Sequence, residues 1–144
     1  MKGSYTLLIR LPEAQTMTIG SLSDVYFPQG YYAYVGSALG GIKARLGRHL
    51  NQSKRLHWHI DYLLQKASIT AIIIGESEGR AECAIARALS AQFDSIPSFG
   101  SSDCGCSSHL FFAAEGRRVR STIMTTFELL AIPPKLMMLR GQQK

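Results

Sequence analysis

The chain has 144 residues, of which 46% are hydrophobic and 18% are charged, and its formal net charge is +6. This length and composition are typical of one globular domain with its own core, and they exclude an intrinsically disordered segment. No apolar run approaches the ~18 residues that a transmembrane helix needs, and the N-terminus lacks the layout of a secretion signal, so we expect a cytoplasmic protein with no membrane partner.

The residues before position 51 predict three strands and a helix. Strand character is found at residues 5–11, at 17–22, and from Tyr31 onward after a loop at 27–30. A helix from about 41 to 50 follows, because apolar side chains recur at every fourth position (Ile42, Leu46, Leu50). Short connections between the strands indicate a small, largely antiparallel sheet.

The rest of the chain adds helices, one buried strand and a loop. Helices are predicted at 57–64, 80–93 and 119–131, strands at 69–76 and 110–112, and a Gly- and Ser-rich loop at 99–109. We therefore expect an α+β fold in which helices flank a small, largely antiparallel sheet. A single domain is expected over residues 3–132, with a C-terminal tail at 133–144.

Basic residues are concentrated in one part of the sequence. No acidic residue occurs between Asp24 and Asp61, and five cations fall in that gap: Lys43, Arg45, Arg48, Lys54 and Arg55. Together with a pI of about 9.5, this distribution favours a polyanionic partner such as nucleic acid. A solvated basic face with no partner is the alternative.

Residues 30–49 combine tyrosines, small residues and a cation. The expected strand ends at Gly36-Ser37-Ala38, where a backbone or a ligand can approach closely. On the following helix Arg45 and His49 lie four residues apart and share one face. This combination of residues would suit the binding of a phosphodiester group.

Glu82 falls inside the apolar stripe of its predicted helix, beside Ile85, Ala86 and Leu89. A buried carboxylate is costly unless it is paired or binds a metal. The alternative is capping, in which Gly79 is the N-cap and Glu82 binds back to the backbone.

Histidines and cysteines in the second half also allow two interpretations. His57 and Asp61 are four residues apart, so a histidine there either transfers protons or contacts phosphate, or it is merely held by Asp61 while Trp58 fills core. Cys104, Cys106 and His109 suggest zinc, but Cys83 would have to supply the fourth ligand, and helical numbering places it on a different face from Glu82. We therefore expect the loop to border a cleft, with Asp103 and His109 as polar participants.

Tyr34-Val35-Gly36, followed by Arg45, resembles the second half of the GIY-YIG nuclease signature, and Gly3-Ser4-Tyr5 resembles the first half. More narrowly, the chain is similar to the Uri-type branch of that superfamily, which is also found fused to endonuclease III homologues. The shared segments are GYYAYVGSALGG, HWHIDYLL and FGSSDCGCSSHLFF, and they cover most of residues 3 to 112.

The resemblance implies a GIY-YIG-like fold and a metal-dependent endonuclease active in DNA repair. Its implied catalytic residues are Tyr5, Tyr34, Arg45, His49 and Glu82, with Glu82 as the ligand of one Mg²⁺ or Mn²⁺ ion. Expected contacts with nucleic acid, DNA favoured over RNA, are Lys43, Arg48, Lys54, Arg55, His57, His59, Asp103 and His109. A repair or targeting protein that supplies specificity is the expected protein partner.

The chain departs from the family pattern in one respect. Many GIY-YIG nucleases have an asparagine near the end of the module, and no clear equivalent stands here. A nucleic-acid-binding module that cleaves slowly or not at all is therefore the alternative function, and a zinc-stabilised interaction domain is a third.

Overall fold

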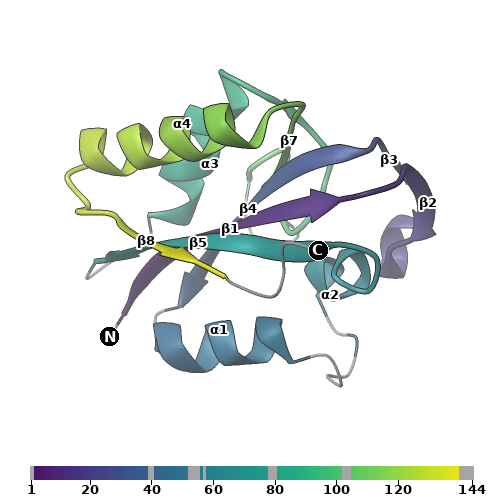
Figure 1. Cartoon of the computed structure of the whole chain (residues 1–144), viewed down its shortest axis with the longest axis horizontal. Coiled ribbons are helices and arrows are strands. Elements are labelled where there is room, and N and C mark those ends of the chain that lie inside the picture. Colours follow the sequence, from purple (N-terminus) through teal and green to yellow (C-terminus); the bar gives the residue numbers. More distant parts are fainter. Residues whose placement is uncertain are drawn as a thin grey trace.

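The computed structural model describes residues 2–38, 41–51, 56, 58–77, 81–101 and 105–139. Its main feature is a six-stranded sheet in which every neighbouring pair of strands is antiparallel, in the order β6-β7-β4-β1-β5-β8. The strands are β1 (Gly3–Leu11), β4 (Gly30–Ala38), β5 (Ser68–Glu76), β6 (Asp94–Ser95), β7 (Leu110–Ala113) and β8 (Lys135–Met138). A second, two-stranded sheet of β2 (Gln15–Thr18) and β3 (Asp24–Phe27) lies at one end of the molecule (Figure 1).

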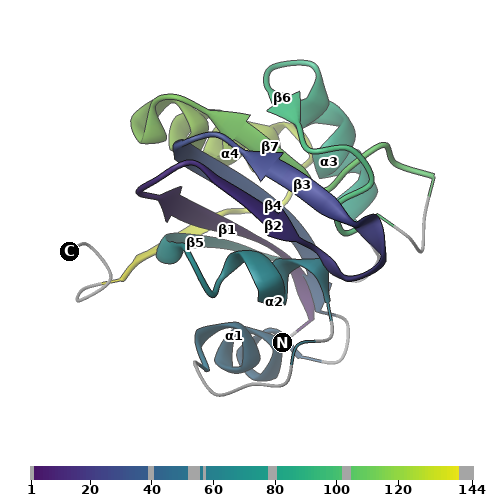
Figure 2. The same cartoon turned by 90° about the vertical axis from the view of Figure 1, so that its right-hand side faces the viewer.

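Helices cover both faces of the large sheet, as Figures 1 and 2 show. One face carries α1 (Ile42–Leu50) and α2 (His59–Leu63), and the other carries α3 (Glu82–Ser90) and α4 (Gly116–Leu129). The predicted α+β class, with helices flanking a largely antiparallel sheet, is therefore confirmed. No helix in the described part of the chain is long and apolar enough to span a membrane.

The two faces of the sheet hold two separate cores because side chains alternate along each strand. On β1, Tyr5, Leu7, Ile9 and Leu11 belong to the core beneath α1 and α2. Leu8 belongs to the core beneath α3 and α4, which also contains Ile85 and Phe127. The central strands β1 and β5 are consequently buried on both faces, although β1 turns Ser4 and Thr6 to the same side as Leu8.

Several boundaries differ from the sequence prediction. The strand expected at 17–22 is β2, which ends at Thr18, and residues Gly20–Leu22 form a single 3₁₀ turn. This turn is favoured by the positive φ angles of Gly20 (45°) and Ser23 (64°), which an extended strand does not permit. The helices predicted at 57–64 and 80–93 correspond to α2 and α3, which are both shorter than predicted.

The segment expected as a C-terminal tail contributes to the sheet. Residues Lys135–Met138 form β8, which pairs with Ile74 to Ala71 of β5 at the sheet edge. The side chains of β8 remain exposed, including Leu136, Met137 and Met138. The sheet therefore extends beyond residue 132.

Candidate active site

Tyr5 of β1 and His49 of α1 form the centre of the candidate site. The Tyr5 hydroxyl lies 2.6 Å from His49 Nε2, and only 1% and 2% of these two residues are exposed. His49 takes the core position that the sequence pattern assigned to Leu50, which is 38% exposed instead. The prediction of Leu50 on the buried face was wrong because His49, three residues after Leu46, also lies on that face and gains a partner there.

Burial has the largest effect on the pKa of Tyr5. It raises the pKa of the phenol to about 12, although the charge of Arg45, a hydrogen bond from Arg45 and the charge of Arg48 act in the opposite direction. The hydroxyl therefore carries its proton at neutral pH and can donate it to the lone pair of His49 Nε2. The sequence predicted both residues as catalytic, and the structure brings their side chains into direct contact.

Gly36 of β4 makes room for this contact. Gly36 is the direct cross-strand partner of Tyr5, and a Cβ at this position would overlap the Tyr5 ring and hydroxyl. Glycine is thus required as the third residue of the Tyr-Val-Gly triplet, because the Tyr5 ring opposite fills the space that a side chain would need.

Tyr34, the other predicted catalytic tyrosine, lies in the same core. Its ring packs against Phe99 at 6.2 Å and against His49 at 6.2 Å, measured between ring centroids. Burial, and to a smaller extent the charges of Tyr5 and Glu82, raises the pKa of Tyr34 above its ordinary value. These surroundings are those of a core aromatic, and of the two tyrosines Tyr5 has the better placed proton acceptor.

Arg45 and Arg48, one turn apart on α1, both lie against Trp58. Their guanidinium carbons are 4.6 Å and 4.1 Å from the centroid of the Trp58 ring, a cation–π arrangement. Arg45 Nη1 also donates to the Ser37 carbonyl at 3.0 Å, so the end of β4 fixes its orientation. The half-buried Arg45 is therefore held beside Tyr5 by a bond to a backbone carbonyl and not by a bond to a carboxylate.

Arg48 has a different partner. Its two terminal nitrogens donate to the two oxygens of Asp61 at 2.8 Å and 2.9 Å, and Asp61 also accepts a bond from the Trp58 backbone N–H at 2.7 Å. The pair ties α1 to the start of α2 and raises the pKa of Arg48. This cation, predicted to contact nucleic acid, has its planar fork engaged by a carboxylate with no exposed side-chain area.

Glu82 is the first residue of α3, which begins after Ala81, and it is half-buried. The prediction of a cap at Gly79 with Glu82 at the third helical position was wrong, because the helix begins about two residues later than the sequence pattern suggested. Although α3 lies on the opposite face from α1, the negative charge of Glu82 acts on both candidate tyrosines and raises the pKa of each. Glu82 thus belongs to the electrostatic environment of the site.

The other predicted contacts with nucleic acid are dispersed. Lys43 is exposed on α1, and His59 is half-buried on α2, where its Nδ1 accepts a bond from the Gly100 N–H at 2.8 Å. Burial lowers the pKa of His59 and of His109, and for His109 the charge of Glu82 opposes this effect. Lys54, Arg55, His57 and Asp103 lie outside the described residues.

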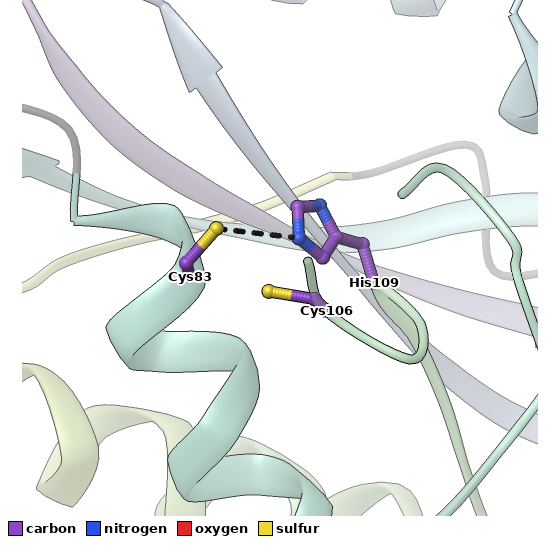
Figure 3. Close-up of side chains that lie close together, drawn as sticks. All are labelled: Cys83, Cys106 and His109. Carbon is purple, nitrogen blue, oxygen red and sulfur yellow. Dashed lines mark hydrogen bonds between the residues drawn. The ribbon is translucent and has the colours of Figure 1, made fainter. Parts of the chain in front are cut away.

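Three potential metal ligands gather where α3 meets the loop before β7. The Sγ atoms of Cys83 and Cys106 and a ring nitrogen of His109 all lie within 4.8 Å of one another. Figure 3 shows the three side chains converging, Cys83 from α3 and the other two from the loop. Helical numbering placed Cys83 on a different face from Glu82, and this was wrongly taken to separate Cys83 from Cys106 and His109: Cys83 lies in the first turn of α3, which abuts this loop. Cys104 lies outside the described residues.

Sequence reasoning overlooked the role of Trp58, which it placed in the core. Its partly exposed ring contacts the two arginines and lies 5.9 Å from the His49 ring. The sequence holds an aromatic residue and an acid at positions 58 and 61, shortly after the cations at 45 and 48, but their spacing alone does not show that they meet.

Comparison with known proteins identifies the family. A family model described as "Domain of unknown function DUF123" matches residues 4–132, which is most of the chain. No curated protein and no solved structure matches significantly. The six-stranded α+β architecture agrees with a GIY-YIG-like fold. The chain therefore belongs to the DUF123 family, a family of GIY-YIG-like domains.

Proposed function

We propose that the protein is a divalent-metal-dependent endonuclease that hydrolyses phosphodiester bonds in nucleic acid, DNA in preference to RNA. The observation that carries the proposal is the 2.6 Å contact between the Tyr5 hydroxyl and His49 Nε2, beside the Arg45 guanidinium. It places a proton donor–acceptor pair and a cation together at the small-residue end of β4. Phosphodiester hydrolysis needs both, one to activate water and the other to neutralise developing charge.

The Tyr5–His49 pair offers a path for one proton. A phenol with a pKa of about 12 is a weak base while it keeps its own proton. In the proposed step the Tyr5 proton passes to His49 Nε2 while the Tyr5 oxygen accepts a proton from the attacking water. As the water oxygen forms its bond to phosphorus, the bond between phosphorus and the leaving oxygen breaks, and the leaving oxygen takes a proton from solvent. His49 holds one additional proton at the end of the step and returns it to solvent afterwards.

Arg45 would hold the phosphate. Its guanidinium has a planar fork of donors that matches two phosphate oxygens. The Trp58 ring and the Ser37 carbonyl restrict its side chain, so little conformational freedom is lost when a phosphate binds. Lys43, exposed two residues earlier on α1, would add non-specific attraction for the nucleic-acid backbone.

Glu82 would hold the metal ion. The residues fit a hard ion such as Mg²⁺ or Mn²⁺, which commonly binds through one or two carboxylates and completes its shell with water and substrate phosphate. Glu82 supplies a half-buried carboxylate whose charge acts on Tyr5 and Tyr34. When bound, such an ion supplies electrostatic stabilisation of the charge that develops on the phosphate.

A specific observation favours the alternative function, a binding module that cleaves slowly or not at all. Tyr5 and His49 are almost fully buried, and burial leaves the phenol a poor base. The family's terminal asparagine also has no clear equivalent in the sequence. Under this alternative Arg45 and Lys43 would bind nucleic acid while Tyr5 and His49 served only the core.

Cleavage assays decide between the two functions. Labelled single-stranded, duplex and flapped DNA and RNA would be incubated with the protein and Mg²⁺ or Mn²⁺. The wild type would be compared with Arg45→Ala and Glu82→Gln, and with the matched controls Arg87→Ala and Glu128→Gln, which alter exposed helical residues of the same types. We expect metal-dependent cutting that both site variants lose and both controls keep. Salt-sensitive binding without cutting would instead support the binding module.

Two finer assignments accompany the proposal. We propose that the chain belongs to the Uri-type branch, because the segments GYYAYVGSALGG, HWHIDYLL and FGSSDCGCSSHLFF all occur in it. We also propose that a repair or targeting protein supplies sequence or structure specificity. Pull-down of the purified protein with and without a flapped DNA would test for such a partner.

A further inference from the structure

We propose that Cys83, Cys106 and His109 are ligands of one Zn²⁺ ion that joins the first turn of α3 to the loop preceding β7. The proposal does not rest on nuclease activity, since the site would exist equally in a binding module. It is also distinct from the hard-metal site proposed at Glu82, because its donors are two sulfurs and an imidazole nitrogen.

The geometry is close to that of a zinc site. The three donor atoms lie within 4.8 Å of one another, and Cys83 Sγ is 4.0 Å from His109 Nε2. In a tetrahedral site with Zn–S near 2.3 Å and Zn–N near 2.0 Å, neighbouring donor atoms are roughly 3.5–3.8 Å apart. Small side-chain rotations would therefore close the group around an ion.

The backbone already holds the donors in place. The His109 N–H donates to the Phe99 carbonyl at 2.8 Å, and the His109 carbonyl accepts a bond from the Val35 N–H at 3.0 Å. These bonds anchor the loop to β4 and leave His109 only 3% exposed. Cys106, three residues earlier, is fixed by a bond from the Ser98 N–H to the neighbouring Ser107 carbonyl at 2.7 Å. A preformed loop reduces the conformational cost of binding an ion.

The donor set selects the metal. Thiolate and imidazole ligands favour Zn²⁺ over Mg²⁺ and Mn²⁺, which prefer oxygen donors. Two donors come from a Cys-x-x-His segment, and the third comes from a helix 23 residues earlier in the sequence. An ion bridging them would therefore restrain two segments that are distant in the chain. Because Glu82 precedes Cys83 directly, the ion would also fix the position of the Glu82 backbone.

Metal analysis of the full chain tests the proposal. Protein purified under reducing conditions would be stripped with a chelator, reloaded with Zn²⁺ and passed over a desalting column before elemental analysis. We expect about one zinc per chain, unaffected by a large excess of Mg²⁺. Cys83→Ser, Cys106→Ser and His109→Gln should each lose most of it. Ser107→Ala, an exposed change in the same loop, should keep it.

Two further measurements guard against variants that fail to fold. Chelation of the wild type should lower its Tm, and added Zn²⁺ should restore it. Co²⁺ loaded in place of Zn²⁺ should give the thiolate charge-transfer and visible bands of a tetrahedral sulfur-containing site, which each folded ligand variant should weaken or shift. The proposal is overturned if folded wild type keeps no zinc, if all three folded variants keep it, or if Cys83 and Cys106 are found joined in a disulfide.

Discussion

The Tyr5 side chain fills the space that a side chain at position 36 would need, because Tyr5 and Gly36 face each other across β1 and β4. The two halves of the signature are thus complementary in volume: Tyr5 in the first half has a large ring, and Gly36 in the second half has no side chain. The contact between Tyr5 and His49 depends on this fit.

Gly36→Ala should therefore displace the Tyr5 ring and break its contact with His49. We expect a loss of stability of about 1–3 kcal/mol from overpacking, measured by urea unfolding, and loss of any cleavage activity. The control is Gly47→Ala in α1, where a Cβ meets no atom within 4 Å and should add about 0.5–1 kcal/mol of helix stability. Equal stability of the two variants would contradict the proposed fit.

Tyr5→Phe removes the hydroxyl but keeps the ring. Cleavage should fall by about 10²-fold or more, the usual contribution of a positioned proton-transfer group, whereas stability should change by only about 1 kcal/mol. The measurement is single-turnover cleavage of the best DNA substrate, with Tyr26→Phe, an exposed tyrosine, as the control. Unchanged cleavage in a folded Tyr5→Phe protein would remove Tyr5 from the mechanism.

Alkaline pH should destabilise the protein partly through Tyr5. Its pKa in the folded protein, about 12, is above the ordinary value of 10.0, so folding favours the protonated phenol. This contribution is fully present below pH 10 and is lost as the pH rises through about 12. Urea unfolding at a series of alkaline pH values should show a steeper loss for the wild type than for Tyr5→Phe. Parallel curves would mean that the phenol is not shielded from solvent.

The Arg48–Asp61 pair should be a major support of the site. Arg48→Ala would leave the fully buried Asp61 carboxylate without its bidentate partner, and because Arg48 itself is partly exposed we expect a loss of roughly 2–3 kcal/mol. Arg48→Lys keeps the charge but not the fork, so it should rescue only part of this loss. Urea unfolding of these variants and of Asp61→Asn, combined in a double-mutant cycle, gives the coupling energy. The exposed Lys43→Ala should have no such coupling to Asp61.

The sequence predicted the central elements well where a strong pattern existed. The buried strand at 69–76 matches β5, and the tyrosine strand matches β4, because β-branched and aromatic runs of this length have few other solutions. The edge strand β8 was missed because Pro133-Pro134 and the short exposed segment after them resemble a tail. Its pairing with β5 depends on tertiary contacts that no local pattern encodes.

The site was predicted in composition but not in arrangement. Tyr5, Arg45 and His49 were predicted as site residues and lie together, whereas the pairing of Asp61 with Arg48, thirteen residues away and on another helix, was not predicted. The proximity of Cys83 to Cys106 and His109 also escaped prediction. Helical numbering gives the face of a residue on its own helix, but it does not say which loop lies across from that helix's end.

Gly36 and Gly3 also affect how the strands of the sheet find their alignment. Both faces of β1 are buried, with Tyr5, Leu7, Ile9 and Leu11 on one face and Ser4, Thr6 and Leu8 on the other, so a slip of one residue would exchange these sets without exposing either to water. The loss of burial in such a slip is therefore small, and its cost comes from exchanging apolar side chains for the hydroxyls of Ser4 and Thr6. Positions without a side chain add a further constraint: a Cβ at Gly36 would overlap the Tyr5 ring, and a Cβ at Gly3 would collide with the backbone of Gly75. Gly36, which makes room for Tyr5 in the candidate site, thus also favours one alignment of β1 and β4 during folding, and Gly3 does the same for β1 and β5.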